Sequence, residues 1–216
     1  MCLGKEVIVK FWSNSFADND PIPEEFAFGK KDAGAHVALS NNRNPHFAWS
    51  DLPAGTRSLA LLCCDPDVPS VGDAVNKEGQ VVPADLPRVD FFHWVLVELD
   101  PGADEIGAGA FSDGVCAKGK DGPAGPGGTR QGVNNYTDWF AGDPDMAGDY
   151  YGYDGPCPPW NDTLLHHYVF SLHALDTAAL ELPERIDGPA VLAAIAAHSL
   201  GSASWTGTYT LNPDVG

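Results

Sequence analysis

The sequence predicts a mainly β protein, a β-sandwich with one or two peripheral α-helices. Short apolar segments of strand length are separated by Pro, Gly, Asp and Asn, and helical periodicity is confined to the C-terminal third. Because the strand-like segments come first and do not alternate with helices, a doubly wound parallel sheet is not expected. A chain of 216 residues, 44% of them hydrophobic, suits one domain spanning residues 1–216.

Four apolar segments are expected to form strands: residues 59–64, 91–99, 167–175 and 204–211. The first is apolar throughout, which predicts burial on both faces. In the third, a period of two places Tyr168, Phe170 and Leu172 on one face, which suits a strand with one drier side.

One helix is expected to begin near Pro189 and to end before Gly201. Proline is favoured in the first helical turn and glycine just after the last, and Val191, Leu192 and Ile195 form an apolar stripe. This pattern predicts a helix of about three turns. The pattern also allows a second, shorter helix over residues 177–180.

Three stretches are expected to be loops: residues 69–90, 118–132 and 142–155. The middle stretch is too rich in Gly and Pro to pack into a core. It is therefore either a mobile surface loop or a segment ordered by a partner.

The net charge excludes some partners. With Lys+Arg 12 against Asp+Glu 30, the formal charge of -18 makes nucleic acid an improbable partner and disfavours an anionic membrane surface. No apolar run approaches the roughly 20 residues of a membrane span, and the first ten residues do not resemble an export signal. We expect a soluble, cytoplasmic, acidic protein, whose acidity reflects either a high-salt environment or ordinary solubility.

The cysteines are expected to be free thiols, and neither a metal nor a cofactor is expected. There is no CxxC pair and no zinc-finger spacing, and Cys63 and Cys64, which are adjacent, cannot pair without strain. Cys157 is the thiol whose reactivity is of most interest. The five are Cys2, Cys63, Cys64, Cys116 and Cys157.

The segment Asp65-Pro66-Asp67 follows an apolar strand directly. Proline stiffens the backbone, so the two carboxylates are expected to project to the same side. They form either part of a polar site or an Asx turn that closes the strand.

Histidines and a rigid loop supply further candidates. His93 opens an apolar strand and is either a satisfied core residue or a ligand group. Residues 155–159 (GPCPP) form a stiff loop suited to a pocket wall. Farther along, His166 and Tyr168 share one strand face while His167 points away.

Taken in order, these motifs resemble the phosphatidylethanolamine-binding protein family, in its bacterial and archaeal branch of Raf kinase inhibitor-like proteins. The resemblance rests on NPHFAWSDLPAGTRSLAL, DPDVPS, HWVLVEL, YDGPCPPWNDTLLHHYVFSLHALD and HSLGSASWTGTY, and runs from about residue 11 to residue 211. It implies a Greek-key antiparallel β-sandwich with a small anion pocket that accepts phosphate or a phosphoryl head group.

The resemblance also implies the site residues. They are Asp65, Asp67, His93, Gly155, Cys157, Pro158, His166 and Tyr168. A carboxylate near an imidazole would raise its pKa and keep it available as a cationic donor. The stretch between Ser70 and Phe91 is longer than in compact members of the branch, and the Gly-rich segment near Lys118 also looks extended.

The leading hypothesis is therefore non-enzymatic binding of a phosphate-bearing small molecule or a phosphorylated group. A kinase- or signalling-modulator role and a homodimer are further implications of the resemblance. The alternative is a weak hydrolase in which His93 or His166 is the base and Asp65 orients it. The sequence lacks GxSxG, HExxH, GxxxxGK[ST] and GxGxxG, which would have indicated other enzyme classes.

Overall fold

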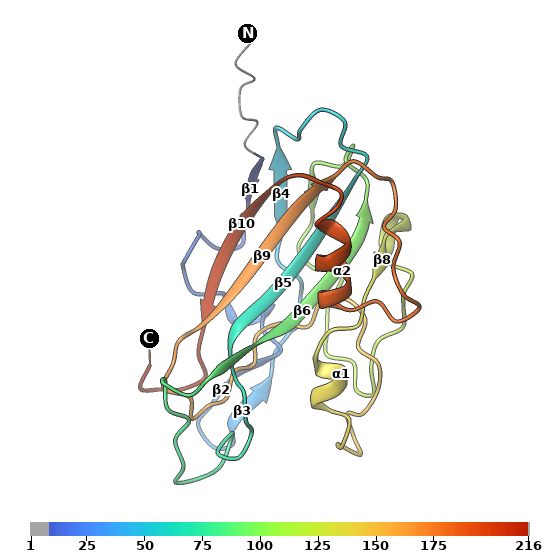
Figure 1. The fold of residues 1–216 in the computed structure, drawn as a ribbon. Coiled ribbons are helices and arrows are strands. Elements are labelled where there is room, and N and C mark those ends of the chain that lie inside the picture. The colour runs from blue at the N-terminus through green and yellow to red at the C-terminus, as the bar shows by residue number, and fades with distance from the viewer. Residues whose placement is uncertain (1–8, 216) are drawn as a thin grey trace.

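The structure, a computed structural model, describes residues 9–215 and is a sandwich of two antiparallel sheets (Figure 1). The large sheet has the strand order β10-β9-β5-β6-β8 and the small sheet has the order β1-β4-β7. The large sheet contains β5 (Ser58–Pro69), β6 (Arg88–Leu99), β8 (Arg130–Gln131), β9 (His166–Leu175) and β10 (Ser199–Tyr209). The small sheet contains β1 (Lys10–Trp12), β4 (Phe47–Ser50) and β7 (Glu105–Ile106), and β2 (Gly29–Asp32) and β3 (His36–Leu39) form a separate hairpin. The predicted mainly β, antiparallel class is confirmed.

The main core lies between the two sheets. Phe47 of β4 packs on Phe170 of β9 with ring centroids 4.5 Å apart, and Leu59, Leu61 and Trp94 join them from the large sheet. Alternation along β9 places Tyr168, Phe170 and Leu172 on this buried face, as the sequence predicts.

A second core lies on the outer face of the large sheet. Ala60 and Leu62 of β5 pack there beneath Val191 and Ile195 of α2 (Gly188–Ile195). Because β5 is covered on both faces, its continuous apolar sequence is explained by burial.

The helix α2 begins as predicted and ends early. The Asp187 side chain accepts a hydrogen bond from the backbone N–H of Ala190 at 2.9 Å and caps the helix N-terminus. The helix ends at Ile195, and Ser199 already pairs with Leu175 of β9. The prediction of a helix reaching residue 200 is wrong because residues 199 and 200 belong to β10, which pairs with β9. Residues 177–179 form bends, and none of residues 177–180 is helical.

Three short helical elements were not expected. They are η1 (Glu24–Phe26), η2 (Pro126–Gly128) and the single turn α1 (Tyr136–Trp139). The expectation that helices are confined to the C-terminal third is therefore wrong. Elements of three or four residues are too short to show a helical period in the sequence.

The expected loops are shorter and more ordered than predicted. Strands β5 and β6 extend toward each other, so the loop between them covers only residues 70–87. The Gly-rich stretch 118–132 contains η2 and β8 and pairs with its own chain: the backbone N–H of Lys120 donates to the carbonyl of Asp149 at 2.9 Å. The stretch is therefore paired with its own chain, while most of residues 118–128 stay exposed at the surface.

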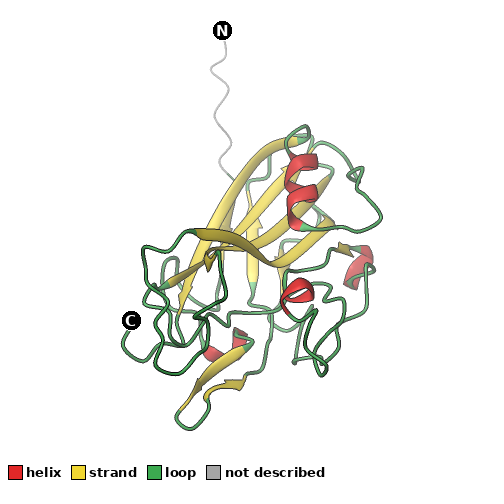
Figure 2. Cartoon of the chain, turned by 60° about the horizontal axis from the view of Figure 1, so that its bottom comes forward, coloured by secondary structure: helices red, strands yellow, loops and turns green. Residues whose placement is uncertain are grey.

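The end of the sandwich where β5 ends and β6 and β9 begin carries the long loops and the β2–β3 hairpin (Figure 2). The four cysteines within residues 9–215 are free thiols, as expected, and Cys2 lies outside the described residues. None of the helices in this range is long and apolar enough to cross a membrane.

Candidate functional site

A cavity of about 250 Å³ opens at this end of the large sheet. Four polar side chains line its buried part: Asp65 from β5, His93 from β6, and His166 and Tyr168 from β9. Val37 of β3 and Phe91 of β6 belong to its mostly apolar wall, and at its rim Leu39 and Trp139 are 60% and 51% exposed. Asp65, His93 and the residue 155–159 loop thus meet at one end of the sandwich.

Asp65 serves both roles that the sequence left open. Its Oδ1 accepts a hydrogen bond from the backbone N–H of Asp67 at 2.8 Å, as in an Asx turn, and its Oδ2 lies 2.7 Å from His166 Nδ1. The pairing of β5 with β6 shifts register between Asp65 and Val68, so a bulge interrupts the alternation here.

The bulge directs Asp67 away from the cavity. Its Oδ2 accepts hydrogen bonds from the backbone N–H of His167 at 2.9 Å and from His167 Nδ1 at 2.8 Å. The expectation that both carboxylates project to the same side does not hold, and Asp67 is not among the residues that line the cavity. Its role is to hold the outward-facing histidine.

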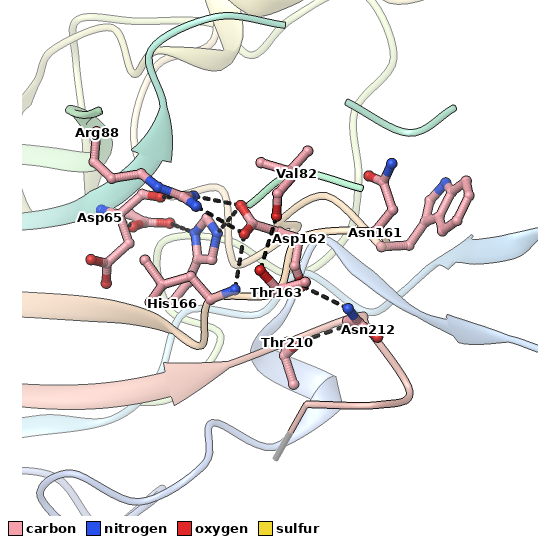
Figure 3. A network of polar contacts seen from close by, with 12 residues as sticks. Asp65, Val82, Arg88, Asn161, Asp162, Thr163, His166, Thr210 and Asn212 are labelled. Atoms are coloured by element: carbon pink, nitrogen blue, oxygen red, sulfur yellow. Dashed lines mark hydrogen bonds and ion pairs between the residues drawn. The ribbon is translucent and has the colours of Figure 1, made fainter. Parts of the chain in front are cut away.

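His166 lies between two buried carboxylates (Figure 3). Its Nδ1 donates to Asp65 at 2.7 Å and its Nε2 donates to Asp162 at 3.1 Å. Burial opposes the charged ring, but the bonds to Asp162 and Asp65 outweigh burial and raise the pKa of His166 to about 9. The raised pKa was expected. The expectation that this histidine offers a cationic donor to a ligand is wrong, because both of its N–H groups are already engaged.

Arg88, at the start of β6, compensates the negative charge of the Asp162 carboxylate. Its Nη1 and Nη2 contact the two carboxylate oxygens of Asp162 at 2.5 and 3.0 Å (Figure 3). The same guanidinium donates to the backbone carbonyls of Asp67 and Pro83 at 2.7 and 2.8 Å. Two carboxylates thus face two cations, so this part of the site carries no net charge.

His93 is held in one tautomer. Its Nδ1 donates to the backbone carbonyl of Asp154 at 2.8 Å, and no hydrogen bond within residues 9–215 engages its Nε2. Burial lowers the pKa of this imidazole, even though Asp65 and Asp154 act in the opposite direction. At neutral pH, therefore, Nε2 is an acceptor and the ring is uncharged.

The Tyr168 hydroxyl is a buried donor without a partner. Within residues 9–215 no group forms a hydrogen bond of ordinary geometry with it; the Asp65 carboxylate is near enough to interact with the hydroxyl but not placed to accept a well-formed bond. The residue lines the cavity and is fully buried. Burial, followed by the nearby charge of Asp65, keeps the pKa of Tyr168 well above its ordinary value, so the hydroxyl stays protonated. An unsatisfied buried hydroxyl costs about 1–3 kcal/mol, which a ligand would recover.

Only part of the residue 155–159 loop lines the cavity. Cys157 and Pro158 line the cavity, and burial raises the pKa of the Cys157 thiol to about 12. Gly155 lies behind the wall, where its N–H donates to Asn42 Oδ1 at 2.8 Å. A Cβ on Gly155 would lie 2.1 Å from the Phe26 carbonyl oxygen, so this glycine permits close packing, and it is not among the residues that line the cavity.

Loop 70–87 forms another part of the wall because Asn161 holds it. The Asn161 amide donates to the carbonyls of Ala74, Lys77 and Gln80 at 2.8, 3.3 and 3.0 Å. Its Oδ1 accepts from the backbone N–H of Asn76, which lines the cavity with Val75. Loop 70–87 is therefore held in place by hydrogen bonds and forms part of the site.

Sequence reasoning missed four polar residues that shape the site: Arg88, Asp154, Asn161 and Asp162. One signal was available, since Asp162 stands four residues before His166. The partners of the others lie tens of residues away along the chain, so no local spacing could have indicated them.

The architecture and the cavity together define a β-sandwich with a small ligand-binding pocket at one end. The family model for phosphatidylethanolamine-binding protein matches residues 12–210. The chain therefore belongs to the phosphatidylethanolamine-binding protein family, as its motifs indicate.

Relatives are found in bacteria and archaea. The UPF0098 protein YbhB of Escherichia coli is 30% identical over 94% of this chain and 100% of its own length. A UPF0098 protein of Methanothermobacter thermautotrophicus is 32% identical over 91% of this chain and 95% of its own length.

Solved structures share the fold. Escherichia coli YbcL, described as a new member of the mammalian PEBP family, has a TM-score of 0.66 at 24% identity, covering 94% of this chain and 98% of that one. A putative PEBP homologue from Chlamydia trachomatis has a TM-score of 0.63 at 24% identity, covering 94% and 97%.

Proposed function

We propose that the cavity binds a phosphate-bearing small ligand without turning it over, and that the bound phosphoryl group carries one proton. The observation that carries this proposal is the Tyr168 hydroxyl beside the cavity, which is buried, protonated and without a well-formed hydrogen bond within residues 9–215. A phosphoryl oxygen supplies the acceptor that this donor lacks.

The charges of the site favour a singly charged ligand over a dianion. Asp65 and Asp162 are balanced by His166 and Arg88, and the His93 ring is neutral. No unpaired cation among the lining residues is available to compensate two negative charges. A dianion would also face the Asp65 carboxylate directly.

The hydrogen-bonding groups match a protonated phosphoryl group. Tyr168 donates, whereas His93 Nε2 and the Asp65 carboxylate accept. A singly protonated phosphate monoester has one O–H to donate and several oxygens that accept. Fully ionised phosphate offers no donor to either acceptor.

The size and walls of the cavity limit the rest of the ligand. A volume of about 250 Å³ is below that of typical drug-sized pockets, and the wall is mostly aliphatic and aromatic. The ligand is therefore a monoester of a small alcohol, or inorganic phosphate in its singly charged form, which carries two protons. A phosphorylated side chain of a partner protein presents the same group, and such binding would underlie a kinase-modulating role.

Weak hydrolysis is the second candidate function. His93 has the free Nε2 of a general base, although the Asp154 carbonyl, and not Asp65, orients its ring. The nearby thiol, Cys157, is protonated because burial raises its pKa to about 12, so it is a poor nucleophile. We expect binding without turnover.

The test is calorimetric titration with phosphorylethanolamine at pH 6, using wild type, Tyr168→Phe and the control Tyr151→Phe, whose side chain does not line the cavity. Tyr168→Phe is expected to weaken binding about tenfold or more while leaving the free energy of unfolding unchanged or higher, because only an unpaired hydroxyl is lost. Equal affinity in all three proteins would overturn the proposal. Release of inorganic phosphate from the ligand by wild type, abolished in His93→Ala, would establish the hydrolase instead.

A further inference from the structure

Asp154 contacts His93 twice through its backbone. The Asp154 N–H donates to the His93 carbonyl at 3.0 Å, and the Asp154 carbonyl accepts from His93 Nδ1 at 2.8 Å. The orientation of the imidazole, and the tautomer that leaves Nε2 to the cavity, therefore depend on the placement of this one residue.

The Asp154 side chain is fully buried and requires compensation. Its Oδ1 accepts from Asn42 Nδ2 at 2.7 Å, and its Oδ2 accepts from Asn134 Nδ2 at 2.7 Å. Only Lys120 supplies a positive charge in this cluster of described residues, with Nζ 3.0 Å from Asp154 Oδ2. The same ammonium group donates to the Tyr153 carbonyl.

The Gly-rich stretch brings Lys120 to this position. Lys120 pairs with Tyr150 through the backbone, and its side chain is 12% exposed. A Cβ on Gly148 would lie 2.1 Å from the carbonyl oxygen of Lys118, so only glycine allows these two segments to approach. Gly119, at φ +97°, adopts a backbone conformation that other residues avoid.

We propose that Lys120 is a positioning residue for His93: by neutralising Asp154 it fixes the backbone that orients the imidazole and keeps the ring neutral with Nε2 available. The inference rests on the proposed function in one respect only: the group that contacts Nε2 is taken to be the proposed phosphoryl ligand. It assigns the Gly-rich stretch a role in the site, although Lys120 itself does not line the cavity.

The charged and titratable groups around His93 set the expected direction of the effect. Asp65 of β5 and Asp154 favour the protonated ring, whereas His166 of β9 disfavours it. Tyr136 and Tyr168 also pack against the ring and stay protonated, because burial raises the pKa of both phenols. Without Lys120, the Asp154 carboxylate would act on His93 uncompensated.

The experiment is a pH titration of ¹⁵N-labelled histidines by NMR, using wild type, Lys120→Met and Lys120→Arg. Lys120→Met is expected to raise the pKa of His93 by about one pH unit and to remove the single Nδ1–H tautomer. Lys120→Arg, which keeps the charge, is expected to match wild type. His198, which pairs with Asp176 beyond the far end of β9, is the internal control.

Gly148→Ala is a second variant that acts on loop geometry alone. Its Cβ would displace the segment that carries Lys120, so we expect the same change at His93. An unchanged pKa and tautomer of His93 in folded Lys120→Met, or in folded Gly148→Ala, would overturn the inference. The readout needs no ligand, so failure of wild type to bind phosphorylethanolamine would contradict only the proposed function.

Discussion

His166 donates to Asp65 across 2.7 Å where both side chains are almost fully buried. The pair is held in place by a second carboxylate, Asp162, which Arg88 contacts through two nitrogens. Because these charges compensate one another, the site can keep ionised groups out of water beside an otherwise apolar cavity.

The stability of the fold should fall as the pH rises through the range in which His166 loses its proton. The pKa of His166 is raised from 6.5 to about 9 in the folded state, so its contribution is fully present below pH 6.5 and is lost as the pH approaches 9. We expect the free energy of unfolding to fall by on the order of 2 kcal/mol between pH 6.5 and pH 8.5. Urea unfolding at the two pH values measures this, and no decrease would be inconsistent with a protonated His166.

Arg88→Met should destabilise the protein far more than loss of an exposed arginine. It leaves Asp162 with a buried charge and removes two bonds to backbone carbonyls, so we expect a loss of about 3 kcal/mol. Arg185→Met is the matched control, since Arg185 forms exposed ion pairs with Asp138 and Asp149 and should cost less than about 0.5 kcal/mol. Similar losses in the two variants, measured by urea unfolding, would contradict the buried network.

Cys116, and not Cys157, should be the reactive thiol. Cys116 is exposed, whereas burial raises the pKa of Cys157 to about 12 and leaves little of the reactive thiolate. In a Cys2→Ser background, a disulfide reagent at pH 8 should label one thiol rapidly in the native protein and the other thiols only after unfolding. If Cys116→Ser leaves the rapid phase intact, the assignment is wrong.

Most of the large sheet was predictable because β5, β6, β9 and β10 are long, whereas β8, with 2 residues, was not predicted. Leu59 to Leu62 alternate between two cores, and β9 shows a clear period of two. The small sheet was not predicted, since β1, β4 and β7 have only 3, 4 and 2 residues. Tertiary pairing also overrode local propensity at Ser199, where the helical pattern continues but the chain joins β9.

The candidate site could be predicted as a set of residue types but not as a network. One cavity is lined by Asp65, His93, His166 and Tyr168. Asp67 points away from it because of a bulge in β5, which no residue pattern predicted. The spacing of Asp162, four residues before His166, was the available signal, but it did not predict that two carboxylates would engage both nitrogens of this histidine. Because both nitrogens of His166 are engaged, we expect Tyr168 and His93 to contact the ligand in its place.

The most direct test of the proposed function is the number of protons taken up when phosphorylethanolamine binds. Calorimetry at pH 8 in buffers of different ionisation enthalpy measures this number. A phosphate monoester has a second pKa near 6 and is a dianion at pH 8, so binding of its singly protonated form requires uptake of about one proton. We expect uptake near one proton at pH 8, with affinity falling about tenfold per pH unit above pH 7, and uptake near zero at pH 5. Binding at pH 8 without proton uptake would contradict the proposal, because the cavity would then accept the dianion.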